Sequence, residues 1–130
     1  MPTLIAMRST LTIAVAAVIA ALAPAVAIAK DGDVERRGSC SGASSAKIKL
    51  SPDDGRLEAE FEVDQNRRGV TWSVRIRRNG DLAVRANATT RGRSGSFSVE
   101  RRITDGPGAD TVVARAVSPS GEVCTARATI

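Results

Sequence analysis

Apolar residues recur at every second position along most of the chain from Ala46 to Ile130, and this period limits the possible folds strongly. The stretch "LEAEFEVD" (57–64) is the clearest example, because its odd positions are apolar and its even positions are acidic. Successive side chains of a β-strand point to opposite faces of a sheet, so the pattern predicts strands with one buried face. No helical period competes with it in this range.

Turn sequences divide this range into seven predicted strands. "SPDDG", "RNGD" and "SPSG" are tight turns, and three longer links separate the other strands. The predicted strands are 46–50, 57–63, 70–77, 82–88, 96–103, 112–116 and 124–130. Short strands at even spacing predict an all-β fold, a seven-stranded antiparallel β-sandwich. We expect the first, second and fifth strands in one sheet and the other four in the second.

The first hairpin can be given a register from its charges. If Leu50 lies opposite Leu57, Lys49 lies opposite Glu58 and opposite charges meet on the exposed face. Lysines opposite the row Glu58, Glu60 and Glu62 would leave nothing to raise the pKa of these carboxyls.

The turn "RNGD" (78–81) leaves two registers for the next hairpin. A two-residue Asn-Gly turn would direct Arg85 into the core. A three-residue loop of 78–80 instead sets Ile76 opposite Leu82 and directs Leu82 and Val84 inward. Because a slip of one residue exchanges the two faces of a strand, we predict the three-residue loop.

The strand pattern of 46–130 resembles an immunoglobulin-like or fibronectin-type-III-like domain. Trp72 occupies the place of the buried tryptophan of such folds, although the chain has no tyrosine for their tyrosine corner. Its cysteines also lie outside the second and sixth strands, where an immunoglobulin domain has them. The whole chain resembles small secreted proteins found in actinobacteria, and that resemblance implies no biochemical activity.

Residues 1–29 have the composition of an export signal. One basic residue, Arg8, precedes an apolar run that ends in "AIA", and the first acidic residue follows directly. This predicts an N-terminal signal helix cleaved after Ala29, although cleavage after Ala25 or Ala27 fits the same small-residue pattern. The alternative is an uncleaved anchor, since the run would just span a bilayer of about 30 Å. Its high alanine content and cleavage site favour the signal peptide.

Cleavage would leave a secreted mature chain of 30–130 with no membrane span. We expect 30–45, which is charged and then rich in glycine and serine, to be a flexible polar tail. The β-sandwich domain would then be 46–130, and we expect it to be a monomer.

The chain has two cysteines, Cys40 and Cys124, and no histidine. Cys40 lies too far after Ala29 to be a lipid anchor. Two cysteines alone are too few for a zinc site, and no histidine is present to activate a nucleophile. An even number of cysteines in a secreted chain predicts a disulfide between them. We expect no metal and no cofactor.

The predicted sandwich sorts the charges by face. Residues 30–130 hold 18 basic and 14 acidic side chains, a net charge of +4. The outer face of the second sheet would carry five arginines, which we call the arginine face: Arg75, Arg77, Arg85, Arg115 and Arg127. Arginine binds carboxylate and phosphate through its planar fork, so this face is the candidate binding site. The alternative is a face that is only solvated.

These features predict a secreted, non-catalytic binding module at or outside the cell envelope. Its partner would be an anionic cell-wall polymer or the acidic surface of a protein. We expect no nucleic-acid partner, because the protein is exported and offers no exposed aromatic side chain for base stacking. The alternative function is a small inhibitor or effector that acts through its loops, especially 65–69 and 90–95.

Overall fold

The computed structural model describes residues 32–130, together with residues 14 and 16. Apart from residues 14 and 16, the predicted signal peptide and its cleavage sites lie outside the described residues, so they stay predictions. Within it the protein is all-β, and every strand pairing is antiparallel. The nine strands of the described residues are β1 (Val34–Arg37), β2 (Ser39–Cys40), β3 (Ser45–Asp53), β4 (Arg56–Asp64), β5 (Thr71–Arg78), β6 (Asp81–Thr89), β7 (Ser96–Thr104), β8 (Thr111–Val117) and β9 (Val123–Thr129).

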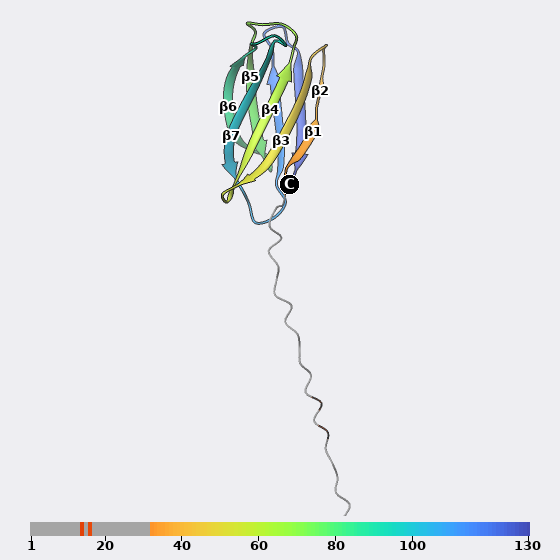
Figure 1. Ribbon diagram of the computed structural model, residues 1–130, viewed down its shortest axis with the longest axis vertical. Helices are drawn as coiled ribbons and strands as arrows, with labels where there is room; N and C mark the ends of the chain where they lie inside the picture. Colours follow the sequence, from red (N-terminus) through yellow and green to blue (C-terminus); the bar gives the residue numbers. More distant parts are fainter. Residues whose placement is uncertain (1–13, 15, 17–31) are drawn as a thin grey trace, which may run out of the picture.

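The strands form two sheets that pack around one apolar core (Figure 1). The four-stranded sheet has the order β1-β3-β4-β7, and the five-stranded sheet has the order β2-β9-β8-β5-β6. Both groupings predicted from the sequence are confirmed, each with one strand added. Trp72 is fully buried between the sheets and packs on Phe97, with ring centroids 6.0 Å apart.

The predicted count of seven strands is wrong for the described residues, because β1 and β2 lie where a flexible polar tail was expected. β1 pairs with β3, so that Val34 lies opposite Leu50 and packs against the core. β2 pairs with β9 and sets Cys40 opposite Cys124. Both strands lie at sheet edges and contribute few apolar side chains, which explains the polar sequence of this segment.

Gly38 lies between β1 and β2, where the chain passes from the four-stranded sheet to the five-stranded sheet. Its N–H donates to the carbonyl of Ala46 at 2.8 Å. A Cβ atom at this position would overlap the carbonyl oxygen of Thr125. The crossing therefore requires the smallest residue because of space, since the backbone of β9 lies directly against it.

The register predicted for the first hairpin is wrong by two residues. β3 continues through Pro52 to Asp53, and only Asp54 and Gly55 form the turn, both with positive φ (49° and 73°). Lys49 therefore lies opposite Glu60, and Glu58 lies opposite Ser51. A two-residue turn of this kind fits the twist of antiparallel strands better than the wider turn that the sequence suggested.

The β5–β6 hairpin uses the two-residue turn that the sequence argument rejected. Asn79 and Gly80 both have positive φ, as a type I′ turn requires. A β-bulge next to Ile76 then restores the apolar face, so that Ile76 lies opposite Val84. Val84 is buried as predicted, whereas Leu82 was predicted to point inward and is 43% exposed.

A buried ion pair fixes the end of the sandwich near this turn. Asp110 is only 1% exposed and accepts hydrogen bonds from Nε of Arg78 at 2.7 Å and Nδ2 of Asn79 at 3.1 Å. Its other carboxylate oxygen accepts from the N–H of Gly106 at 2.9 Å. The link between β7 and β8 is thereby held to the end of β5.

Candidate functional site

All five side chains of the arginine face lie exposed on the outer side of the five-stranded sheet. β5 carries Arg75 and Arg77, and β6, β8 and β9 carry Arg85, Arg115 and Arg127 respectively. Strand alternation places them there, because the neighbouring residues on each strand, such as Val74 and Ile76, point inward and fill the core.

Strand register brings three of these arginines into one line across the sheet. Arg75 on the central strand lies directly opposite Arg85 on one side and Arg115 on the other. We call these three the arginine row. Neighbouring strands are about 4.8 Å apart, so three cationic side chains start from backbone positions at that spacing. Nothing in the sequence pattern alone requires this alignment, because it depends on the bulge in β6.

The remaining two arginines flank the row. Arg77 lies opposite Val113, and Val113 lies opposite Arg127, so a valine separates them. Nη1 of Arg77 donates to the carbonyl of Gly80 at 3.4 Å, which directs this side chain toward the turn. The arginine face therefore consists of the row and two more distant cations.

The electrostatics of the row are unfavourable for the isolated fold. Like charges directly opposite each other on adjacent strands are destabilising. Within residues 32–130, no carboxylate forms an ion pair with any member of the arginine row. An anionic ligand would relieve this repulsion and supply acceptors for the guanidinium groups.

A shallow hollow adjoins the row. Ser73, Arg75, Arg115 and Val117 line it, and its volume is about 240 Å³. Two guanidinium groups and one hydroxyl can donate hydrogen bonds there, while the valine adds an apolar wall. The hollow suits a small anionic group presented by a larger partner.

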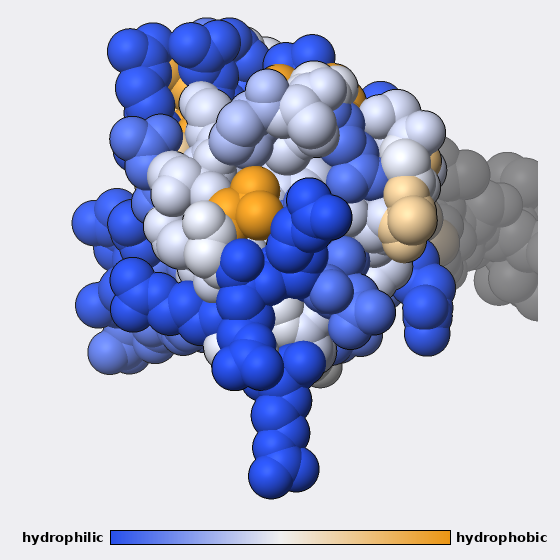
Figure 2. All heavy atoms as spheres, turned by 90° about the horizontal axis from the view of Figure 1, so that it is seen from above, coloured by the Kyte–Doolittle hydropathy of each residue, from blue (hydrophilic) through white to orange (hydrophobic). Residues whose placement is uncertain are grey.

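The two loops singled out in the sequence, 65–69 and 90–95, lie together at the end of the molecule opposite the C-terminus. The N–H of Gln65 donates to the carbonyl of Gly95 at 3.1 Å, and the N–H of Gly69 donates to Thr90 at 2.8 Å. Nε1 of Trp72 donates to the side chain of Gln65 at 3.1 Å. Figure 2 looks onto this end and shows mainly hydrophilic side chains around a small hydrophobic area. Its basic residues are Arg67, Arg68, Arg91 and Arg93.

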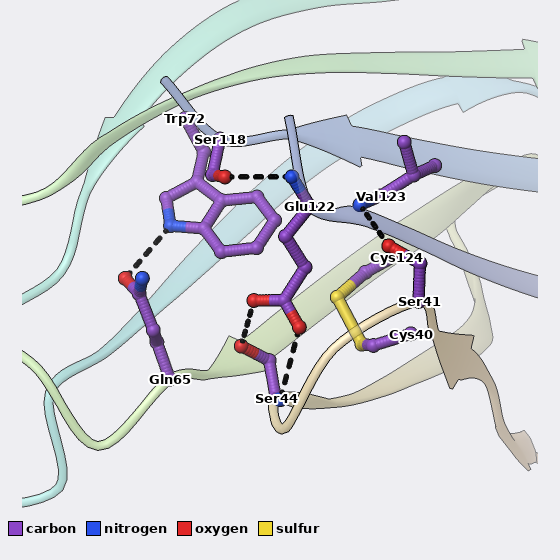
Figure 3. Close-up of a disulfide and its surroundings, with 9 residues drawn as sticks. All are labelled: Cys40, Ser41, Ser44, Gln65, Trp72, Ser118, Glu122, Val123 and Cys124. Atoms are coloured by element: carbon purple, nitrogen blue, oxygen red, sulfur yellow. Dashed lines mark hydrogen bonds between the residues drawn. A yellow bond between two sulfur atoms is a disulfide. The ribbon is translucent and has the colours of Figure 1, made fainter. Parts of the chain in front are cut away.

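The predicted disulfide joins Cys40 to Cys124, with a Cα–Cα distance of 4.0 Å (Figure 3). Glu122 closes the loop beside it, because its carboxylate accepts from the hydroxyl of Ser44 at 2.6 Å and from the N–H of Ser44 at 3.1 Å. Both cysteines are therefore structural, and the nearby carboxylate is engaged in holding the loop.

The carboxyls of Glu58, Glu60 and Glu100 come together on the outer face of the four-stranded sheet, within 4.8 Å of one another. A hydrogen bond with Glu100, and then desolvation and nearby negative charges, raise the pKa of Glu58 above its usual 4.5. The expectation that nothing would raise this pKa is wrong, because the register shift moves the lysine away from Glu58.

Sequence reasoning missed the pair of Arg78 and Asp110. The sequence pattern places Arg78 in a turn and gives Asp110 no partner. The only sequence signal for Arg78 was its position beside an Asn-Gly turn. Asp110 is 32 residues away in the sequence, so only the fold brings the two side chains together.

No protein-family model, curated protein or solved structure matches this chain.

No helix in the described part of the chain has the length and apolar character needed to cross a membrane.

Proposed function

We propose that the chain is a secreted, non-catalytic binding module that holds an anionic partner on its arginine face. The observation that supports this most is the arginine row, in which Arg85, Arg75 and Arg115 occupy opposed positions on three adjacent strands. Their mutual repulsion costs the fold stability, and a bound anion would offset that cost.

A binding role fits the chemistry of the chain better than catalysis. The sequence has no histidine, and both cysteines form the disulfide. Glu58, whose pKa is raised, lies on the outer surface of a sheet among other carboxyls. These groups offer no activated nucleophile of the kind that covalent catalysis uses.

Export to the cell envelope or beyond supports this proposal. A disulfide that ties strands 84 residues apart is typical of proteins that fold in an oxidising compartment. The N-terminal sequence has the composition of a signal peptide, with cleavage expected after Ala29. We also propose an immunoglobulin-like domain, which the order of β9, β8, β5 and β6 supports. N-terminal sequencing of the exported protein tests the cleavage site.

The partner we propose is an anionic cell-wall polymer or an acidic protein surface. Nucleic acid fits poorly, because all three aromatic residues of the chain, Phe61, Trp72 and Phe97, are buried and cannot stack on bases. A sheet face with arginines at opposed positions on neighbouring strands suits a ligand with repeated negative charges.

The test is retention of the purified protein on immobilised cell-wall polymer over a salt gradient. Replacing Arg75→Glu and Arg115→Glu should lower affinity roughly 100-fold, since each lost charged hydrogen bond is worth about 1.5 kcal/mol or more. Wild-type binding should also weaken steeply as salt rises.

The matched control is Arg37→Glu with Arg56→Glu. These two exposed arginines lie on the four-stranded sheet and give the same change in net charge. If both double variants lose retention equally, the net charge of the protein explains binding and the position of the arginines does not. Unchanged retention of the first variant would also contradict the proposal.

A second candidate function is a small inhibitor or effector that acts through its loops. The hydrogen bonds between 65–69 and 90–95 favour it, because they hold both loops in one conformation before any partner arrives. Replacing 65–69 with a short glycine-serine loop would abolish this activity and leave polymer retention intact. The charge-reversal variant of the arginine row would show the opposite pattern.

A further inference from the structure

The lateral side of the sandwich between β6 and β7 offers a surface separate from the arginine face. Each of these strands is the last in its sheet, so each has one edge without a neighbouring strand in the described part of the chain. Figure 1 shows both strands on the same side of the molecule. Arg91 and Ser96 join them at one end by two backbone hydrogen bonds of 2.8 and 3.0 Å. Next to that bridge lies a hollow of about 410 Å³.

The backbone groups that β7 offers to this hollow follow from strand alternation. Ser96 exchanges both of its backbone hydrogen bonds with Arg91, so its N–H and C=O point away from β4. Every second residue does the same, so Ser98 and Glu100 also point their backbone groups toward the open edge. The carbonyl of Glu100 accepts from Nη1 of Arg101 at 2.8 Å. Ser98 therefore offers this edge both a donor and an acceptor.

The same reasoning applies to β6. The N–H of Thr90 donates to Val70 at 2.9 Å and its carbonyl accepts from Gly69 at 2.8 Å, so its backbone groups point toward the β5 side. Backbone groups alternate in direction along a strand, so the N–H and C=O groups of Asn87 and Thr89 point the other way, toward the open edge. The hollow is thus bordered on both sides by strand edges.

The side chains around the hollow differ between its floor and its rim. Ala88, Phe97 and Val99 provide apolar surface, and the small size of alanine leaves space there. Arg91 and Arg101 border the same hollow and are exposed. Arg101 occupies an inward-facing position of β7. The other inward-facing residues there, Phe97, Val99 and Ile103, are all apolar. This placement puts its charge at the hollow rather than on the outer face.

We propose that this hollow binds an extended, acidic peptide segment of another protein by β-strand addition to β7. A segment of about four residues would pair with the N–H and C=O of Ser98 and with the N–H of Glu100. Its apolar side chains would cover Ala88 and Phe97, and its carboxylates would meet Arg91 and Arg101. Two copies of this chain paired antiparallel at Ser98 would set Arg101 opposite Gly95 and supply no carboxylate to it, so charge favours a different, acidic partner.

The experiment is selection of a display library of random octapeptides on the purified protein, followed by fluorescence anisotropy with the selected peptides. We expect selected sequences to carry an acidic residue two or four positions from an apolar one, because Phe97, Val99 and Arg101 face the same side of β7. Ser98→Pro removes the free-edge N–H and should weaken binding at least about tenfold. The matched control Ser98→Ala keeps the backbone and should bind within about twofold of the wild type, because the proposed contact uses no side-chain atom of Ser98.

Two further measurements test this binding site without relying on Ser98→Pro. If Ser98→Pro does not fold, Arg101→Glu should cause the same loss, and hydrogen exchange should show new protection of the Ser98 amide when peptide binds. Peptide binding should survive Arg75→Glu with Arg115→Glu, which separates this site from the arginine face. Selected peptides that bind the proline variant as tightly as the wild type would overturn the proposal. So would selection that yields no acidic peptide, or concentration-dependent dimerisation that Ser98→Pro abolishes, which would identify a second copy as the occupant.

Discussion

Glu58 lies beside two carboxyls on the outer face of the four-stranded sheet, although an arginine lies directly opposite it. That arginine, Arg102, forms its ion pair with Asp53 instead, at 3.1 Å. A hydrogen bond with Glu100, followed by desolvation and negative charges, raises the pKa of Glu58. Folding therefore favours the protonated form of this group, and its contribution to stability is present below pH 4.5 and lost as pH rises through the raised pKa.

Glu58→Gln should consequently raise the melting temperature at pH 7 and have little effect below pH 4. Thermal unfolding followed by circular dichroism across this pH range measures both. Glu62→Gln is the control, because Glu62 lies opposite Lys47 and its removal loses an attraction. A gain for the control as large as for Glu58→Gln would attribute the effect to net charge.

Asp110→Ala should destabilise the fold by about 3–5 kcal/mol, because it leaves the guanidinium of Arg78 without its buried partner. The free energy of unfolding in urea measures this loss. Asp33→Ala is the control, since Asp33 pairs with Lys49 at 3.4 Å on the exposed surface and such pairs contribute at most about 1 kcal/mol. Equal losses in the two variants would show that the buried ion pair contributes no more to stability than the exposed one.

The strands could be predicted from the sequence more completely than their pairing. A shift of two residues keeps every side chain on its face, so the alternation in 57–64 could not separate Lys49 opposite Glu58 from Lys49 opposite Glu60. The bulge in β6 was equally hidden, because one extra residue allowed the Asn-Gly turn and an apolar face to coexist. Register therefore depended on turn geometry rather than on periodicity.

The candidate site was predicted in its residues but not in its arrangement. Alternation alone placed the five arginines on one face. The alignment of Arg75 with Arg85 and Arg115 required the register of three strands, which the sequence could not provide. The hollow between β6 and β7 was missed for the same reason. Arg101 breaks the apolar pattern of β7, which fits either a bulge or an edge strand, and β7 is an edge strand.

Gly38→Ala tests the crossing between β1 and β2. The added methyl group would overlap the backbone of β9, and such overpacking costs about 1–3 kcal/mol. Urea unfolding measures the change, and hydrogen exchange should show reduced protection in β1 and β2 first. Gly108→Ala is the control, because no atom lies within 4 Å of the added Cβ. A stable Gly38→Ala variant with unchanged protection would contradict the assigned role.

For the molecule as a whole, the disulfide is the longest covalent constraint, with a sequence separation of 84 between its two cysteines. Cys40→Ala with Cys124→Ala should lower the free energy of unfolding by about 4–5 kcal/mol, because the unlinked chain gains loop entropy when unfolded. Urea unfolding of the double variant and of the reduced wild type should agree. A loss below about 1 kcal/mol would mean that the unfolded chain is little restricted by the bond.

The position of that disulfide also determines how the protein responds to mechanical force. Pulling on the two ends of the domain loads β1, β2 and the last residues of β9, while the loop closed by Cys40 and Cys124 carries no tension along its length. Without the bond, that loop could extend by roughly 280 Å. β5, β6 and β8 each lie within the closed loop, so they should stay folded when the domain is pulled by its two ends.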